Sequence, residues 1–93
     1  EVSITAQPAD KDVTEGAISG SLSVTAKSDG ELTYQWYSCD DETGRGAVKV
    51  AGETSATMNI PKDLTAGEHC FFVKVIVNGI AGINSNIATV TVL

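Results

Sequence analysis

The feature that most restricts the fold of this chain is an alternation of apolar and polar residues with a period of two. It runs through residues 22–27 and again through residues 88–92. Such alternation is typical of a β-strand with one face against a core and the other in water. Val, Ile and Thr are abundant, and their branched Cβ atoms favour pleated strands over helices. An all-β fold is therefore expected.

Turn-forming residues separate the expected strands at short intervals. Pro8 interrupts the first strand, and Asn78 and Gly79 both tolerate the positive φ of a type I′ hairpin turn. Strict pairing across that hairpin would bury Asn84 and Asn86, so we expect a β-bulge after the turn. The expected strands are 2–6, 12–15, 20–27, 32–39, 47–50, 56–60, 68–77 and 80–92. Many short strands at such spacing indicate a sandwich or a small barrel.

The size and charge of the chain limit its organisation and its partners. A chain of 93 residues forms one domain, and 42% hydrophobic residues are enough to build a core. The net charge of −6 argues against nucleic acid as a partner, because phosphates require clustered Lys and Arg. No apolar stretch is long enough for a membrane span, and no direct membrane insertion is expected.

Several segments resemble, in order, the strands of I-set-like immunoglobulin domains. Residues 7–8, 13–16 and 22–24 are similar to the A-to-B segment, and 32–37 to strand C with its core tryptophan, Trp36. The remaining matches are residues 55–60 for strand E, 66–71 for the approach to strand F, and 85–92 for strand G. Together these segments cover nearly the whole chain. Their amino-acid sequence is most similar to that of the immunoglobulin-like repeats of bacterial surface proteins.

The resemblance implies an immunoglobulin-like antiparallel β-sandwich of seven or eight strands in two sheets. Residues 1–93 then form a single domain, expected to be one module of a larger protein. Val24 and Phe71 stand where the family carries its inter-sheet cysteines, and His69 stands where it carries a corner tyrosine. Neither the family disulfide nor the tyrosine corner is therefore expected. The predicted core contains Leu22, Val24, Tyr34, Trp36, Ile60, Phe71, Val73, Val75, Val90 and Val92.

In this fold strands C and F are antiparallel neighbours, and one register accounts for their outward-facing residues. If Trp36 points inward, then Gln35, Tyr37 and Cys39 point outward, because successive side chains of a strand alternate between faces. Phe72 and Cys70 face the same side from strand F. The register that sets Cys39 opposite Cys70 also sets Tyr37 opposite Phe72 and Gln35 opposite Lys74.

This register predicts a cross-strand disulfide between Cys39 and Cys70. The bond would close a loop of about thirty residues and contribute roughly 3–4 kcal/mol in the chain-entropy account. It would also indicate an oxidising compartment, either extracellular or at the cell surface. The alternative is two reduced thiols. Two thiolates and His69 leave zinc one ligand short, so no metal site is expected.

The outer face of strands C and F is the one surface that suggests binding. Tyr37 and Phe72 lie on it, with Gln35, Lys74 and Ile76 around them. Aromatic side chains on an open sheet can stack on a sugar or contact another protein. The alternative is a cross-strand aromatic pair that stabilises the sheet by about 0.5–1 kcal/mol.

Other candidates for chemistry are weaker. Asp40, Asp41 and Glu42 form an acidic loop that could hold Ca²⁺, but the loop lacks the alternating spacing of a calcium site, and a solvated turn is preferred. Lys74 with Asn84 or Asn86 would form an isopeptide bond only if the lysine were buried beside an acid. No nucleophile motif, phosphate loop or fixed pair of carboxylates is recognised. We expect no catalytic residue and no cofactor.

The sequence favours a non-catalytic structural or spacer module of a bacterial surface or secreted protein. Its expected partners are neighbouring domains of the same chain. The alternative is a module for cell adhesion that binds carbohydrate or a host protein through the outer C–F face or the adjacent loops.

Overall fold

The computed structural model of the chain describes residues 2–40 and 43–93. Within these residues the chain forms ten β-strands and no helix. The strands are β1 (Ser3–Ala6), β2 (Lys11–Val13), β3 (Ser21–Ser23), β4 (Thr25–Lys27), β5 (Leu32–Cys39), β6 (Val48–Lys49), β7 (Thr57–Asn59), β8 (Gly67–Val77), β9 (Ile80–Asn84) and β10 (Ala88–Val92). The prediction of an all-β chain is confirmed.

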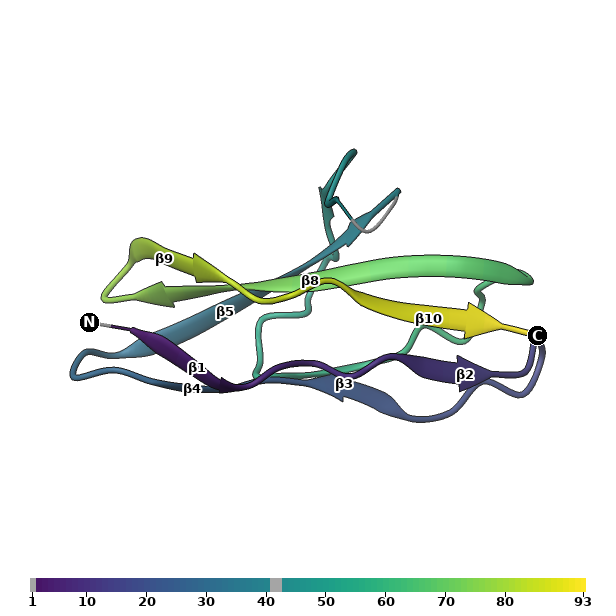
Figure 1. Cartoon of the computed structure of the whole chain (residues 1–93), viewed down its shortest axis with the longest axis horizontal. Coiled ribbons are helices and arrows are strands. Elements are labelled where there is room, and N and C mark those ends of the chain that lie inside the picture. Colours follow the sequence, from purple (N-terminus) through teal and green to yellow (C-terminus); the bar gives the residue numbers. More distant parts are fainter. Residues whose placement is uncertain (1, 41–42) are drawn as a thin grey trace.

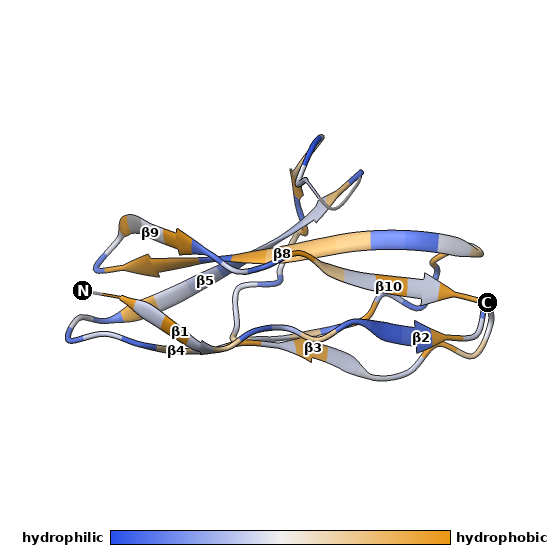
Figure 2. Ribbon diagram, in the orientation of Figure 1, coloured by the Kyte–Doolittle hydropathy of each residue, from blue (hydrophilic) through white to orange (hydrophobic). Residues whose placement is uncertain are grey.

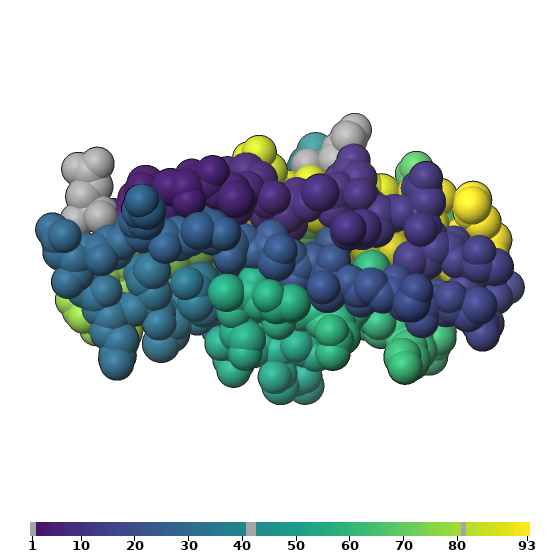
Figure 3. All heavy atoms as spheres, turned by 90° about the horizontal axis from the view of Figure 1, so that it is seen from below, coloured from purple at the N-terminus to yellow at the C-terminus, as the bar shows by residue number. Residues whose placement is uncertain are grey.

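The strands pair into one six-stranded sheet and two two-stranded sheets. In the larger sheet the order is β2-β10-β8-β5-β6, and β9 also pairs with β8. The two smaller sheets pair β1 with β4 and β3 with β7. Figure 1 shows β8, β9 and β10 in one layer, and β1, β3 and β4 in the layer opposite. Seen from below, that opposite layer presents the purple and blue N-terminal segments beside the green segment that includes β7 (Figure 3).

The prediction of seven or eight antiparallel strands is wrong in two respects. Residues 20–27 and 80–92 each form two strands instead of one, which gives ten. The first of these segments divides because β4 pairs with β1 while β3 pairs with β7, and Val24 between them donates its amide to the Ala56 carbonyl. The larger sheet is mixed because β2 runs parallel to β10.

The predicted hairpin and bulge lie between β8 and β9. Asn78 and Gly79 have φ values of 51° and 78°, as a type I′ turn requires. The register shifts between Val75 and Ile76, which leaves Gly82 as the extra residue on β9. Asn84 therefore pairs with Lys74 and stays exposed, and the bulge that was predicted from the asparagines is confirmed.

The core lies between the layers and is built by alternate residues of β3, β5, β8 and β10. Nine of the ten predicted core residues are buried, and Tyr34 packs against the core while half-buried. Trp36 is fully buried, and its Nε1–H donates to the Ser55 carbonyl at 2.7 Å. The prediction omitted Ile18, Met58 and Ala88, which complete the cluster.

The molecule is elongated, with principal extents of 41 × 23 × 22 Å. β1 begins near one end of the long axis, and β10 ends at the other (Figure 1). The start of β1 and the end of β10 therefore lie at opposite ends of the long axis of the molecule.

Candidate functional site

The outer face of β5 and β8 has the register predicted from the sequence. Gln35 pairs with Lys74, Tyr37 with Phe72 and Cys39 with Cys70. The inward pairs match as well, since Trp36 lies opposite Val73, and both side chains are fully buried. The structure therefore brings the predicted surface residues together in adjacent pairs.

The aromatic pair on this face is closely stacked. The ring centroids of Tyr37 and Phe72 lie 5.1 Å apart, and the ring planes differ by 5°. The Lys74 Nζ lies 5.6 Å from the centroid of the Tyr37 ring, within the range of a cation–π contact. Phe72 is only 8% exposed although it belongs to the outer face. The ring faces thus make contacts within the chain.

Gln35 also makes contacts within the chain. Its Nε2 donates to the Trp36 carbonyl at 2.9 Å, to the Val50 carbonyl at 3.1 Å and to the Glu53 carbonyl at 3.4 Å. These bonds fasten the segment after β6 to the edge of β5. Gln35 therefore acts as a structural amide that closes this edge.

Lys49 is the member of this surface that the sequence did not reveal. It is the register partner of Tyr37 on β6 and is exposed. The sequence predicts a strand over residues 47–50. It does not predict how that strand pairs with β5, because the length of the loop before it does not determine the register. With Lys74, Lys49 gives the aromatic pair two lysine neighbours.

Lys74 does not have the surroundings that an isopeptide bond requires. Its Cα partner on β9 is Asn84, which is exposed, and Lys74 is half-buried. Its ammonium group lies over the Tyr37 ring. Asn86 is exposed, and its backbone amide donates to the Gln7 side chain at 2.8 Å.

The two cysteines are opposed in register, but the structure contains no disulfide between them. The predicted bond is thus absent from this structure, in which Cys39 is half-buried and Cys70 is buried. A shared register brings two backbones opposite each other, whereas a disulfide also requires converging Cβ vectors and a specific torsion. Register alone was therefore not a sufficient basis for the bond.

We expect the two thiols to differ in reactivity. In the native protein Cys39 should be alkylated by iodoacetamide at least about tenfold faster than the buried Cys70, because reactivity follows exposure of the thiolate. Mass spectrometry of the native and the denatured, non-reduced protein measures both rates. If neither cysteine reacts in denaturant until reductant is added, the protein contains the disulfide and the thiol state described here is wrong.

A hollow of about 390 Å³ lies beside the cysteines. Cys39 and Cys70 line it together with Lys49, Asp63 and His69. The His69 Nε2 lies 2.8 Å from the Thr65 carbonyl oxygen, so this nitrogen carries the proton and donates it to the carbonyl. His69 is thereby fixed to the backbone four residues upstream.

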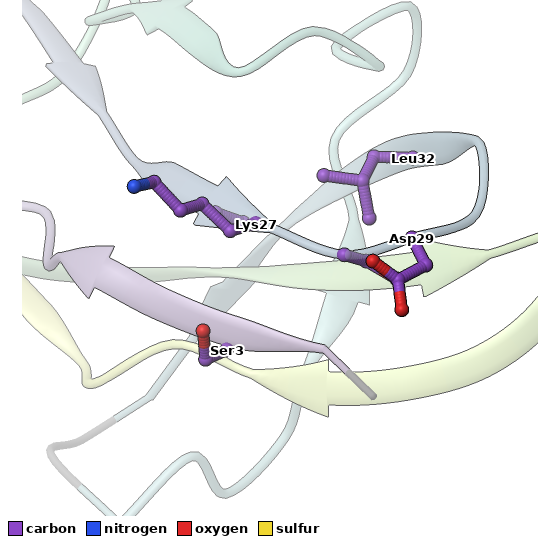
Figure 4. Close-up of a pocket in the computed structure, with 6 residues that line it drawn as sticks. Ser3, Lys27, Asp29 and Leu32 are labelled. Carbon is purple, nitrogen blue, oxygen red and sulfur yellow. The ribbon is translucent and has the colours of Figure 1, made fainter.

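A second hollow, of about 500 Å³, lies between β1, β4 and the start of β5. Ser3, Lys27, Asp29 and Leu32 line it, and Figure 4 shows the Lys27 side chain extending away from the Asp29 carboxylate. The two charges therefore do not converge on one point.

The remaining features concern metal binding and membrane insertion in residues 2–40 and 43–93. In this part of the chain no three His, Cys, Asp or Glu side chains lie close enough together to hold a metal ion. The acidic loop falls mostly outside the described residues, since Asp41 and Glu42 are not among them, and Asp40 is exposed. Over the same residues, the structure has no helix of the length and apolarity needed to cross a membrane.

Comparison with known families gives one match. Residues 3–93 match the family described as Domain of unknown function (DUF8696), so the chain belongs to that family. No curated protein matches the chain. The family description names neither a fold nor an activity.

Proposed function

We propose that this member of the DUF8696 family is an immunoglobulin-like β-sandwich module that acts as a non-catalytic spacer in a bacterial surface or secreted protein. Its partners are neighbouring domains of the same chain. The observation that carries the proposal is the placement of the chain ends on a body 41 Å long, with β1 beginning at one end and β10 ending at the other. Each copy in a series would therefore lengthen the chain by close to its own long axis.

The strand arrangement supports the immunoglobulin-like part of the proposal. β5, β8 and β10 are neighbours in the order expected of strands C, F and G. β3 pairs with β7 as strands B and E would, and β1 pairs with β4 as strands A and B would. The two small sheets together would form the second sheet of the sandwich.

The hydrogen bond of His69 gives further support. In immunoglobulin-like domains a tyrosine near the start of strand F bonds to the backbone a few residues upstream. Here His69, near the start of β8, donates to the Thr65 carbonyl at 2.8 Å. A different side chain would thus make the corner contact, so the absence of a tyrosine at position 69 does not argue against the fold.

The binding alternative has less support than the spacer. A sugar or protein ligand would need the faces of Tyr37 and Phe72, and these stack on each other while Lys74 covers Tyr37. The amide of Gln35 is bonded to backbone carbonyls. We therefore prefer the spacer function to adhesion through this face.

Small-angle X-ray scattering of tandem copies tests the spacer function. Chains of two, three and four copies joined end to end should gain about 41 Å in maximum dimension per copy, the length of the long axis. A gain of less than about half that length would mean that the copies fold back on one another, and the spacer proposal would be overturned. Repeating the series at high salt separates stacking from charge repulsion between the acidic copies.

A further inference from the structure

Three strands end the six-stranded sheet, and they differ in how they are protected from further pairing. Natural edge strands usually carry charged residues or proline, or are very short, because an open edge invites another strand. β2 carries Lys11 and Asp12, and β6 has only two residues, one of which is Lys49. β9 has five residues, no charge and no proline, and it carries the bulge at Gly82. Figure 2 shows the contrast, since β2 is largely blue while much of β9 is orange.

β9 also exposes apolar side chains along its open edge. Ile80 is 73% exposed and Ile83 is 36% exposed. β8 pairs with one edge of β9, and within the described residues no strand pairs with the other. At Gly82 the Val2 side chain approaches β9, 3.2 Å from the position that a Cβ on Gly82 would take. Backbone donors and acceptors are thus combined with exposed isoleucines on one strand.

The charge distribution indicates which partner fits this edge. The chain has a net charge of −6, yet no charged residue occurs from Val75 to Leu93. Two copies of the chain repel each other over most of their surfaces, as like-charged bodies do. β9 itself places no charge opposite the β9 of another copy. An uncharged edge on an acidic chain is therefore best matched to a second copy of itself.

We propose that β9 is a self-association edge, at which β9 of one copy pairs antiparallel with β9 of a second copy about a two-fold axis. Antiparallel pairing of identical strands makes the interface isologous. Ile80 and Ile83 of both copies therefore lie in the interface. The six-stranded sheets of the two copies become one continuous sheet. An edge of five residues makes a small interface, so association between separate copies is weak and depends on concentration. It strengthens where many copies are held close together.

This inference goes beyond the spacing function, because it concerns lateral contact between chains. Sedimentation equilibrium and NMR from about 10 µM to about 1 mM test it. The wild-type protein should show a dimer fraction that rises with concentration. Its concentration-dependent amide shifts should be confined to β9 and the adjoining turn.

Ile80→Lys should weaken dimerisation at least about tenfold, because it places a charge from each copy at the shared edge. Val48→Lys is the matched control. Val48 is 63% exposed on β6, another edge strand of the same sheet, and the substitution makes the same change in net charge. Val48→Lys should leave the dissociation constant unchanged within about twofold.

A wild-type protein that stays monomeric to about 1 mM would overturn the proposal. Concentration-dependent amide shifts located away from β9 would also overturn it, and that result requires no variant. An equal loss of dimer affinity in Ile80→Lys and Val48→Lys would do the same. Circular dichroism melts confirm that each variant is folded. A monomeric result leaves the spacer proposal intact, because the length of the tandem chains does not depend on β9 pairing.

Discussion

Replacing Trp36 by alanine is expected to lower the free energy of unfolding by about 3–5 kcal/mol, a large part of the stability of a domain this small. The indole is fully buried at the centre of the core. Its removal leaves a cavity, and it also removes the donor that bonds the Ser55 carbonyl at 2.7 Å. The backbone of Trp36 further anchors the segment after β6, because its carbonyl accepts from Val50 and its amide donates to Glu53.

Urea unfolding followed by circular dichroism measures this effect. Tryptophan fluorescence cannot be used for the variant, because Trp36 is the only tryptophan of the chain. Val48→Ala serves as the control, since Val48 is 63% exposed and its truncation should cost no more than about 0.5 kcal/mol. A loss below about 1 kcal/mol in Trp36→Ala would mean that the indole is not the buried centre of the core.

Ser85→Ala is expected to cost about 1–3 kcal/mol, although it removes a single oxygen atom. Ser85 is a buried polar residue where the chain passes from β9 to β10. Its hydroxyl accepts the Val73 amide at 3.0 Å and donates to the Asn86 carbonyl at 2.9 Å. Alanine would leave the buried Val73 amide without this acceptor, and an unsatisfied buried donor costs its full desolvation free energy.

The same urea measurement tests Ser85→Ala against Ser23→Ala. Ser23 is exposed on β3, and its truncation should change the free energy of unfolding by no more than about 0.5 kcal/mol. Ser85→Thr should not rescue stability, because the added methyl group has no space at a residue that is 7% exposed. Equal losses in Ser85→Ala and Ser23→Ala would contradict the role of the hydroxyl.

The sequence predicted the long central strands well because each contains a clear alternation. In β5 the core position of Trp36 determines which alternate residues face inward. In β8 the face that carries Lys74 must point away from the core, because the lysine is charged. Those two constraints determine which residues face outward. Setting Cys39 opposite Cys70 on strands that the resemblance makes neighbours then predicts the register of three outward pairs, and the structure has that register. The bulge was predicted for the same reason, because burying two asparagines in an apolar core would be too costly.

Other features depended on contacts that no local pattern contains. The division of residues 20–27 arises because β3 and β4 pair with different strands. The parallel pairing of β2 with β10 joins residues about eighty positions apart. The contacts of Gln35 with the Val50 and Glu53 carbonyls depend on the path of a loop. A disulfide also needs side-chain geometry that a shared register does not specify, and the structure has no disulfide between Cys39 and Cys70. Alternation along a strand determines which face a residue occupies, and it leaves these longer-range choices open.

The parallel pairing of β2 with β10 has a mechanical consequence. These strands belong to the first and last parts of a chain whose ends leave on opposite sides of the body. Tension applied through the two ends therefore slides β2 along β10 and does not peel the strands apart. The bonds between them, with the flanking bonds from Leu93 to Val13 and from Glu15 to Leu93, then share the load. Hydrogen bonds that are loaded together in shear must break nearly together. The pairing of β2 with β10 therefore resists extension as a single unit.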